Sequence, residues 1–111
     1  MAKLGTVTFT GVSGTDYEFN AYPWGTSFKK DFGAVYFVTR RTQKSDGGYS
    51  HTRIYVGQTE DLWVRFDDHH KQGCFDTYGA DCVCIYGEQN EDTRLAIEQD
   101  LIDNYNQLCN G

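Results

Sequence analysis

Residues 34–39 read Ala-Val-Tyr-Phe-Val-Thr and residues 53–57 read Arg-Ile-Tyr-Val-Gly, and these two stretches decide the fold. The first is a nearly continuous run of apolar and β-branched side chains, which is typical of a central strand. The second has the same character, and the polar connection between them contains Asp46-Gly47-Gly48. That tripeptide predicts a turn, so we expect the two stretches to pair as an antiparallel hairpin.

The sequence that follows the hairpin predicts helices around it. Thr59 is a candidate N-cap for a helix that runs to about Gln72. Residues 81–86 are a third apolar strand, and Asn90 is a candidate cap for a final helix over residues 91–105. We therefore predict an α+β domain with a small antiparallel three-stranded core sheet flanked by helices, in the order β-β-α-β-α.

A second hairpin is predicted at the N-terminus. Residues 6–10 and 17–21 alternate between apolar and polar side chains, and a glycine-containing turn separates them. Residues 1–31 are interpreted as an N-terminal β-hairpin extension packed on the core, and residues 32–111 as the main domain. The apolar face of the hairpin is expected to carry Val7, Phe9, Tyr17, Phe19 and Ala21.

Length and composition limit the class of protein. A chain of 111 residues forms one compact domain. No stretch approaches the roughly 18 apolar residues needed to cross a bilayer. No apolar leader segment follows the first residues, so we expect a cytoplasmic protein with no membrane partner.

Charge is distributed unevenly along the chain. The net charge is −6, which argues against nonspecific coating of nucleic acid. Residues 1–53 nevertheless hold seven Lys or Arg against four Asp or Glu, whereas residues 54–111 hold three against twelve. The basic residues are either the solvated edges of a hairpin or a local ridge that meets phosphates. As a nucleic-acid-binding ridge the candidates are Arg40, Arg41, Lys44 and Arg53.

The four cysteines are expected to be reduced, because a cytosolic chain rarely keeps disulfides. Cys82 and Cys84 lie two residues apart in the third strand and share one face. A C-x-C pair within one strand folds poorly around a zinc ion. We therefore interpret these cysteines as small buried side chains.

Several polar side chains are placed where apolar ones are expected. Tyr36 and Tyr55 alternate with their apolar neighbours, so both hydroxyls are expected on one face of the hairpin. Arg65 and His69 share a helix face, an arrangement suited to an anion. The last helix is expected to carry an apolar stripe, and Glu98 falls within it. The stripe consists of Leu95, Leu101, Ile102 and Tyr105. Glu98 is either an edge residue that reaches water or a functional carboxylate.

Together these residues resemble the GIY-YIG nuclease family. Ala34-Val35-Tyr36 corresponds to the first motif, with alanine in place of the family's glycine, and Tyr55-Val56-Gly57 to the second. Arg65, His69 and Glu98 follow in the family's order, Asn110 closes the chain, and the spacing favours His69 over the adjacent His70. The resemblance covers residues 33–110.

The resemblance implies a metal-dependent endonuclease with one Mg²⁺ or Mn²⁺ ion held by Glu98. Tyr36 would act as general base, Arg65 would stabilise the charge on phosphorus, and Tyr55 and His69 would orient the water or the phosphate, with His69 able to relay a proton instead. Gly57 and Asn110 would be supporting residues. The expected partner is nucleic acid, DNA in the first place, with a protein partner or self-association supplying specificity. The alternative is a noncatalytic module on the same scaffold that binds nucleic acid or protein.

Overall fold

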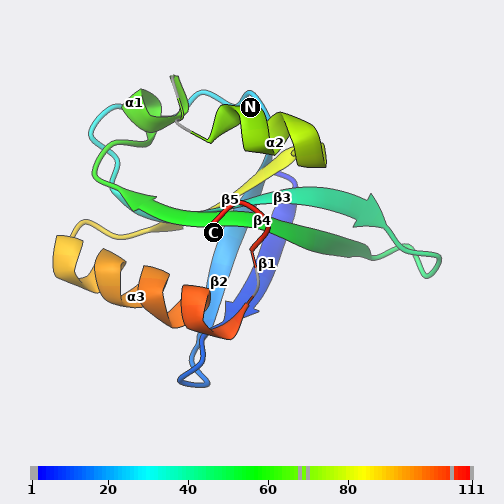
Figure 1. Cartoon of the computed structure of the whole chain (residues 1–111), viewed down its shortest axis with the longest axis horizontal. Helices are drawn as coiled ribbons and strands as arrows, with labels where there is room; N and C mark the ends of the chain where they lie inside the picture. Colours follow the sequence, from blue (N-terminus) through cyan, green and yellow to red (C-terminus); the bar gives the residue numbers. More distant parts are fainter. Residues whose placement is uncertain (1–2, 68, 70, 106, 111) are drawn as a thin grey trace.

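The computed structural model describes residues 3–67, 69, 71–105 and 107–110, and within them the chain forms one sheet and three helices (Figure 1). In chain order the elements are β1 (Gly5–Thr10), β2 (Asp16–Pro23), β3 (Ala34–Gln43), β4 (Tyr49–Thr59), α1 (Leu62–Asp67), α2 (Gln72–Tyr78), β5 (Cys82–Gly87) and α3 (Glu91–Asn104). Among the described residues, no helix has the length and apolar character needed to cross a membrane.

The sheet is antiparallel and curls into a half-barrel with the strand order β1-β2-β5-β3-β4. The predicted α+β class is confirmed, and the three predicted core strands are β3, β4 and β5. The prediction of a three-stranded sheet is wrong, because β2 pairs with β5 and places Asn20 opposite Ile85. The N-terminal hairpin therefore continues the sheet. It does so because Phe19 and Ala21 extend the buried apolar face of the central strands.

Helices cover both faces of the sheet. Figure 1 shows α3 on one side and α1 and α2 on the other. Successive side chains of a strand point to opposite faces of the sheet, so the core consists of two clusters, one on each face. The cluster under α3 includes Phe9, Phe19, Val35, Phe37, Val56, Cys82, Cys84, Ile97 and Leu101. The cluster under α1 and α2 includes Ala34, Tyr36, Val38, Ile54, Leu62, Phe75, Val83 and Ile85.

The single helix predicted over residues 59–72 is wrong. Thr59 is the last residue of β4, and Asp61 caps α1 instead, with its carboxylate accepting from the backbone N–H groups of Trp63 and Val64 at 3.1 and 3.3 Å. The helix ends at Asp67, and a second helix follows at Gln72. One cause is local: the Lys71 N–H donates to the His69 side chain, a bond that competes with helix continuation.

The stretch after Gln72 is helical because Phe75 buries completely against the sheet. It forms α2, a helix in addition to the two that the predicted order β-β-α-β-α contains. Gly79 adopts a left-handed conformation at φ 68° and ends the helix.

The N-terminal hairpin also fixes α3. The Asp100 carboxylate accepts hydrogen bonds from the Ser13 N–H at 2.9 Å, the Ser13 hydroxyl at 2.7 Å and the Tyr17 hydroxyl at 2.9 Å. Gly11 lies so close to Asp100 that no larger side chain fits there. These contacts hold the helix half a turn from Glu98, so the hairpin helps to orient the candidate metal ligand.

The last helix begins as predicted, with the Asn90 side chain accepting from the Thr93 N–H at 3.0 Å. The predicted apolar stripe is partly wrong, because Leu95 is 44% exposed and its place facing the sheet is taken by Ile97. Leu101 is fully buried, as expected.

Candidate active site

The two motif tyrosines lie side by side on neighbouring strands, as predicted. Tyr36 of β3 is fully buried, whereas Tyr55 of β4 is partly exposed. Their ring centroids are 6.0 Å apart, and their hydroxyls are hydrogen-bonded to each other. Of this pair, Tyr55 is therefore the one that can meet solvent or substrate directly.

Gly57 makes room for the pair. It lies opposite Tyr36 in the strand ladder, and a Cβ at this position would come within 2.7 Å of both the Tyr36 hydroxyl and the Tyr55 ring. Side-chain carbons do not approach other atoms this closely, so any larger residue would push the tyrosines apart. The glycine of the second motif thus has a packing reason in this chain.

His69 closes the site from the other side. Its Nε2 lies 2.7 Å from the Tyr36 hydroxyl oxygen, and its Nδ1 lies 3.0 Å from the Lys71 backbone nitrogen. A backbone N–H can only donate, so Nδ1 is an acceptor and the neutral imidazole carries its proton on Nε2. His69 therefore donates to the Tyr36 oxygen, which favours the phenolate form of Tyr36.

The tyrosines are nonetheless strongly held in their protonated state. Burial raises the pKa of Tyr36 far above that of a free phenol, Tyr55 raises it further, and Arg65 acts in the opposite direction. Burial also raises the pKa of Tyr55, followed by the negative charge of Glu98. A tyrosine base in this site requires additional positive charge before it ionises.

Arg65 and Glu98 complete the cluster. Both interact electrostatically with Tyr36 and Tyr55, and the Arg65 charge lowers the pKa of Glu98. Burial is the larger effect on Glu98, so its pKa is raised despite a hydrogen bond from the Gln58 backbone. The structure therefore brings together five predicted residues, Tyr36, Tyr55, Arg65, His69 and Glu98. His70, the competing candidate, lies outside the described residues.

Asn110 braces the edge strand on which Tyr55 lies. Its side-chain amide accepts from the Val56 N–H at 2.8 Å and donates to the Val56 carbonyl at 2.9 Å. The Cys109 N–H donates to the Ile54 carbonyl at 2.7 Å, so the C-terminal segment contacts β4 on both sides of Tyr55. Glu98 in turn interacts with the backbone N–H of Gln58. These contacts occupy backbone groups of β4 that no neighbouring strand pairs with, since β4 lies at the edge of the sheet.

A disulfide fixes this segment, contrary to the expectation of reduced cysteines. Cys74 of α2 is bonded to Cys109, with the two Cα atoms 6.1 Å apart. Cys82 and Cys84 are free and buried, as expected. The pairing could not be predicted from the sequence because it depends on the C-terminal segment returning to α2.

Sequence reasoning also missed Arg94, which is 3% exposed. Its Nε donates to the Gln58 side chain at 3.0 Å, and its Nη1 donates to the carbonyls of Glu88 and Gln89 at 3.0 and 2.9 Å. Arg94 is one helical turn before Glu98 and holds the residue whose backbone contacts Glu98. A buried arginine on the sheet side of an otherwise polar helix carries no sequence signal of its own.

The predicted basic ridge is not gathered into one patch. Arg40 lies against Gly79 at the end of α2, whereas Arg53 stacks on Tyr105 beyond α3 at 4.3 Å from the ring centroid. Arg41 stacks on Tyr49 at 3.4 Å, and Lys44 is exposed in the β3–β4 turn. The stretch thus divides between the two sides of the sheet.

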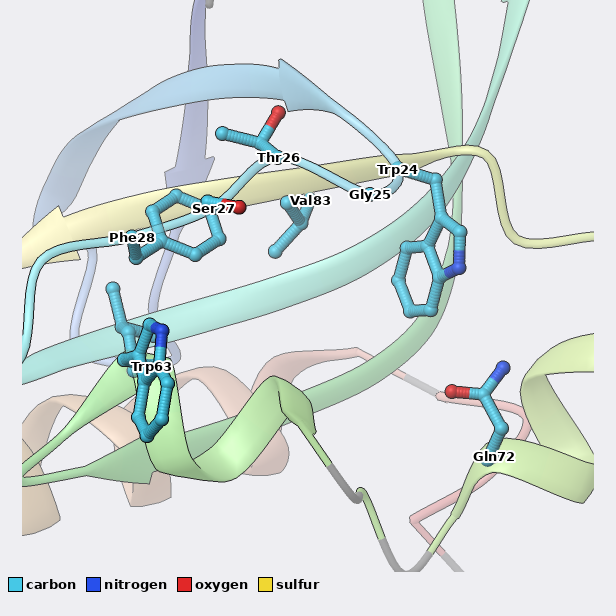
Figure 2. Close-up of a pocket in the computed structure, with 9 residues that line it drawn as sticks. Trp24, Gly25, Thr26, Ser27, Phe28, Trp63, Gln72 and Val83 are labelled. Carbon is cyan, nitrogen blue, oxygen red and sulfur yellow. The ribbon is translucent and has the colours of Figure 1, made fainter.

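Two cavities flank α1. One of about 370 Å³ opens beside Arg65 and is lined by Gln58, Thr59, Glu60, Asp61, Val64, Arg65, Glu91 and Arg94. The other, of about 200 Å³, lies between α1, α2 and the β2–β3 connection. Figure 2 shows Trp24 and Trp63 on opposite sides of this second cavity and Val83 of β5 between them.

A divalent ion fits the cluster by the chemistry of its donors. Glu98 offers a partly buried carboxylate oxygen close to the tyrosines and Arg65. Mg²⁺ and Mn²⁺ prefer oxygen ligands and retain several waters, so one protein carboxylate is sufficient when waters and a phosphate complete the coordination shell.

None of the family models, curated proteins or solved structures compared with this chain matches it.

Replacing Glu98 with glutamine is expected to stabilise the protein at neutral pH. Folding raises the pKa of Glu98, so the folded state holds this proton more tightly than the unfolded state, and stability is lost as the pH rises through the titration of Glu98. We expect Glu98→Gln to raise Tm by a few degrees at pH 7 and to leave it unchanged near pH 4, where Glu98 is already protonated. Calorimetry at both pH values checks this. An equal shift at both would remove the titration from the explanation.

Proposed function

We propose that this domain is a metal-dependent endonuclease of the GIY-YIG type that hydrolyses phosphodiester bonds of nucleic acid, DNA in the first place. The observation that carries the proposal is the convergence of Tyr36, Tyr55, Arg65, His69 and Glu98 from four separate parts of the chain. A buried hydrogen-bonded tyrosine pair beside a cation and a carboxylate is costly for stability. Clusters of perturbed titratable groups of this kind are typical of catalytic sites.

In the proposed reaction, a water molecule attacks phosphorus in line with the 3′ oxygen. The new P–O bond forms as the bond to the 3′ oxygen breaks, and the leaving 3′ oxygen takes a proton from solvent, which gives a 5′-phosphate and a 3′-hydroxyl. The planar guanidinium of Arg65 neutralises the charge that develops on the nonbridging oxygens. Glu98 would hold Mg²⁺ or Mn²⁺, which supplies Lewis acidity at the leaving oxygen when bound.

The attacking water passes its proton to the tyrosine pair. Tyr55 is the hydroxyl within reach of solvent, and as a phenolate that accepts a hydrogen bond from Tyr36 it would take the proton of the water. His69 donates from Nε2 to the Tyr36 oxygen and so orients the Tyr36 hydroxyl toward Tyr55. The Arg65 charge favours the phenolate and so lowers the pKa of both phenols.

The raised pKa values of the tyrosines predict how the rate depends on pH. Because the base is largely protonated at neutral pH, the cleavage rate should rise about tenfold per pH unit from roughly pH 6 to pH 8. Single-turnover rates with saturating metal measure this. A rate that levels off near pH 7 would identify an imidazole, not a phenol, as the base.

Cleavage of a panel of substrates tests the proposal. Single-stranded, duplex, flap and branched DNA and a matching RNA are incubated with Mn²⁺, Mg²⁺ or a chelator at low salt, and the product ends are identified. We expect cutting of at least one substrate that needs the metal and leaves a 5′-phosphate. Metal-independent cutting, or intact substrates throughout, would contradict the proposal.

The second candidate function is nucleic-acid binding without cleavage, and the tryptophan-lined cavity favours it. The ammonium group of Lys30 lies 4.6 Å from the centroid of the Trp63 ring, beside the cavity that Trp24 and Phe28 also line (Figure 2). Aromatic rings next to a cation are suited to stacking unpaired bases while the cation meets phosphate. The same cavity would serve a nuclease as a site for single-stranded substrate.

Replacing Trp63 with alanine is expected to weaken binding of a single-stranded oligonucleotide about tenfold, the loss of one stacking partner. Tyr78→Ala is the matched control, because Tyr78 is 41% exposed and Trp63 is 42% exposed. Fluorescence anisotropy at fixed salt gives both affinities. Equal losses in the two variants would exclude this cavity as the base-binding site.

A further inference from the structure

Three metal-ligand side chains meet on the sheet face opposite Tyr36. His51 of β4 and Cys82 and Cys84 of β5 each place one ligand atom within 4.8 Å of the other two. Both cysteines are free thiols with no exposed surface, and His51 is partly exposed. The cluster is separate from the candidate active site, because the cysteines belong to the core under α3, whereas Tyr36 belongs to the core under α1 and α2.

The fold holds these side chains in position before any ligand arrives. Residues two apart in a strand share a face, which aligns the two thiols. Thr39 of β3 lies opposite Cys82 in the ladder and is fully buried, and its hydroxyl is 2.8 Å from the His51 Nδ1. The Cys82 sulfur therefore lies beside a histidine whose ring is already held by a buried hydroxyl. An outer hydrogen bond that orients an imidazole is typical of metal-binding histidines.

We propose that His51, Cys82 and Cys84 bind one Zn²⁺ ion through one imidazole nitrogen and two thiolate sulfurs. Zn–S bonds of about 2.3 Å in a tetrahedral site place two sulfurs about 3.7 Å apart. The ligand atoms, all within 4.8 Å of one another, reach this geometry by small side-chain rotations. Binding releases two thiol protons to solvent, and the two thiolate charges cancel that of the ion.

The surroundings favour zinc over other occupants. Two sulfurs and an imidazole are poor ligands for Mg²⁺, which prefers oxygen. A cavity of about 180 Å³ is lined in part by His51, so the imidazole is the ligand of the three that lies next to solvent. A disulfide between Cys82 and Cys84 is disfavoured, because Cα atoms two apart in a strand are about 6.6 Å apart, at the upper end of the disulfide range.

Such an ion would link β4 to β5 across β3 on the side of α3. It would therefore be a structural ion that stabilises the sheet, with no contact to the tyrosine pair on the opposite face. The inference does not depend on the proposed nuclease function.

Titration of the full chain with Co²⁺, followed by displacement with Zn²⁺, tests the proposal with the Cys74–Cys109 disulfide left intact. We expect one ion per chain, a thiolate-to-cobalt charge-transfer band and d–d bands of a tetrahedral site. Cys84→Ser should weaken Zn²⁺ binding by more than about 100-fold. Cys74→Ser with Cys109→Ser, which removes two cysteines elsewhere, should leave the spectrum unchanged.

Because Cys84 is buried, a second variant keeps the test decisive if Cys84→Ser fails to fold. His51→Asn lies at the partly exposed edge of the cluster and should weaken Zn²⁺ binding by about 10-fold or more. A cobalt spectrum without a thiolate band, or wild-type affinity in His51→Asn, would overturn the proposal. So would a Cys82–Cys84 disulfide found by mass spectrometry in the purified protein.

Discussion

Replacing Arg65 with alanine is expected to lower the rate of metal-dependent cleavage by about 10³-fold, the cost of removing a group that stabilises the charge on a transferring phosphoryl group. Arg65 acts electrostatically on both tyrosines and on Glu98, so its loss would also raise the pKa of the tyrosines and reduce the population of base. Both effects lower the rate of the chemical step. Single-turnover kinetics at saturating protein separates that step from binding.

Two further variants sharpen this test. Arg40→Ala removes the same charge from an arginine that lies against Gly79 at the C-terminal end of α2, and should keep the cleavage rate. Arg65→Lys keeps the charge but not the planar fork of donors, so it should recover only part of the activity. Similar losses in Arg65→Ala and Arg40→Ala would indicate that the arginines act through general attraction of nucleic acid.

Removing the Cys74–Cys109 disulfide is expected to lower the free energy of unfolding by about 3–4 kcal/mol. The bond closes a loop with a sequence separation of 35 residues, and chain entropy alone gives a loss of this size. For a domain of this length the corresponding fall in Tm is at least about 12 °C. Urea or thermal unfolding of the Cys74→Ser and Cys109→Ser double variant measures the loss.

The same bond should matter for the candidate active site. Cys109 precedes Asn110, and both hold the strand that carries Tyr55. Reductant should therefore lower the Tm of the wild type and leave the Tm of the double variant unchanged. Four free thiols in the purified wild type, with a Tm that reductant does not change, would contradict the presence of this bond.

Local pattern predicted the α+β class and the three strands β3, β4 and β5. The alternation around Tyr36 placed its side chain correctly, and Tyr55 lies on the same face. The predicted alternation fails at Ile54, because a shift in the β3–β4 register next to it puts Ile54 on the same side as Tyr55. Glu98 was identified because its position conflicts with an apolar stripe. It is partly buried at the edge of β4, where it accepts from Gln58.

What the sequence could not predict depends on contacts between distant segments. The helix over residues 59–72 divides because His69 bonds the backbone of Lys71 and Tyr36 at the same time, and neither contact is visible in helical periodicity. The sheet has five strands because β2 finds β5, a pairing that spans most of the chain. His51 joins Cys82 and Cys84 only through the strand order β5-β3-β4.

The central claim is that the cluster around Tyr36 hydrolyses phosphodiester bonds with an ion held by Glu98. The most direct measurement compares wild type and Glu98→Ala in Mn²⁺, with cleavage and affinity determined on the same oligonucleotide. We predict Mn²⁺-dependent cutting by the wild type, a loss of about 10³-fold or more in the variant, and equal affinity without metal. Wild-type protein that binds without cutting, or a variant that cuts as fast, would contradict the account.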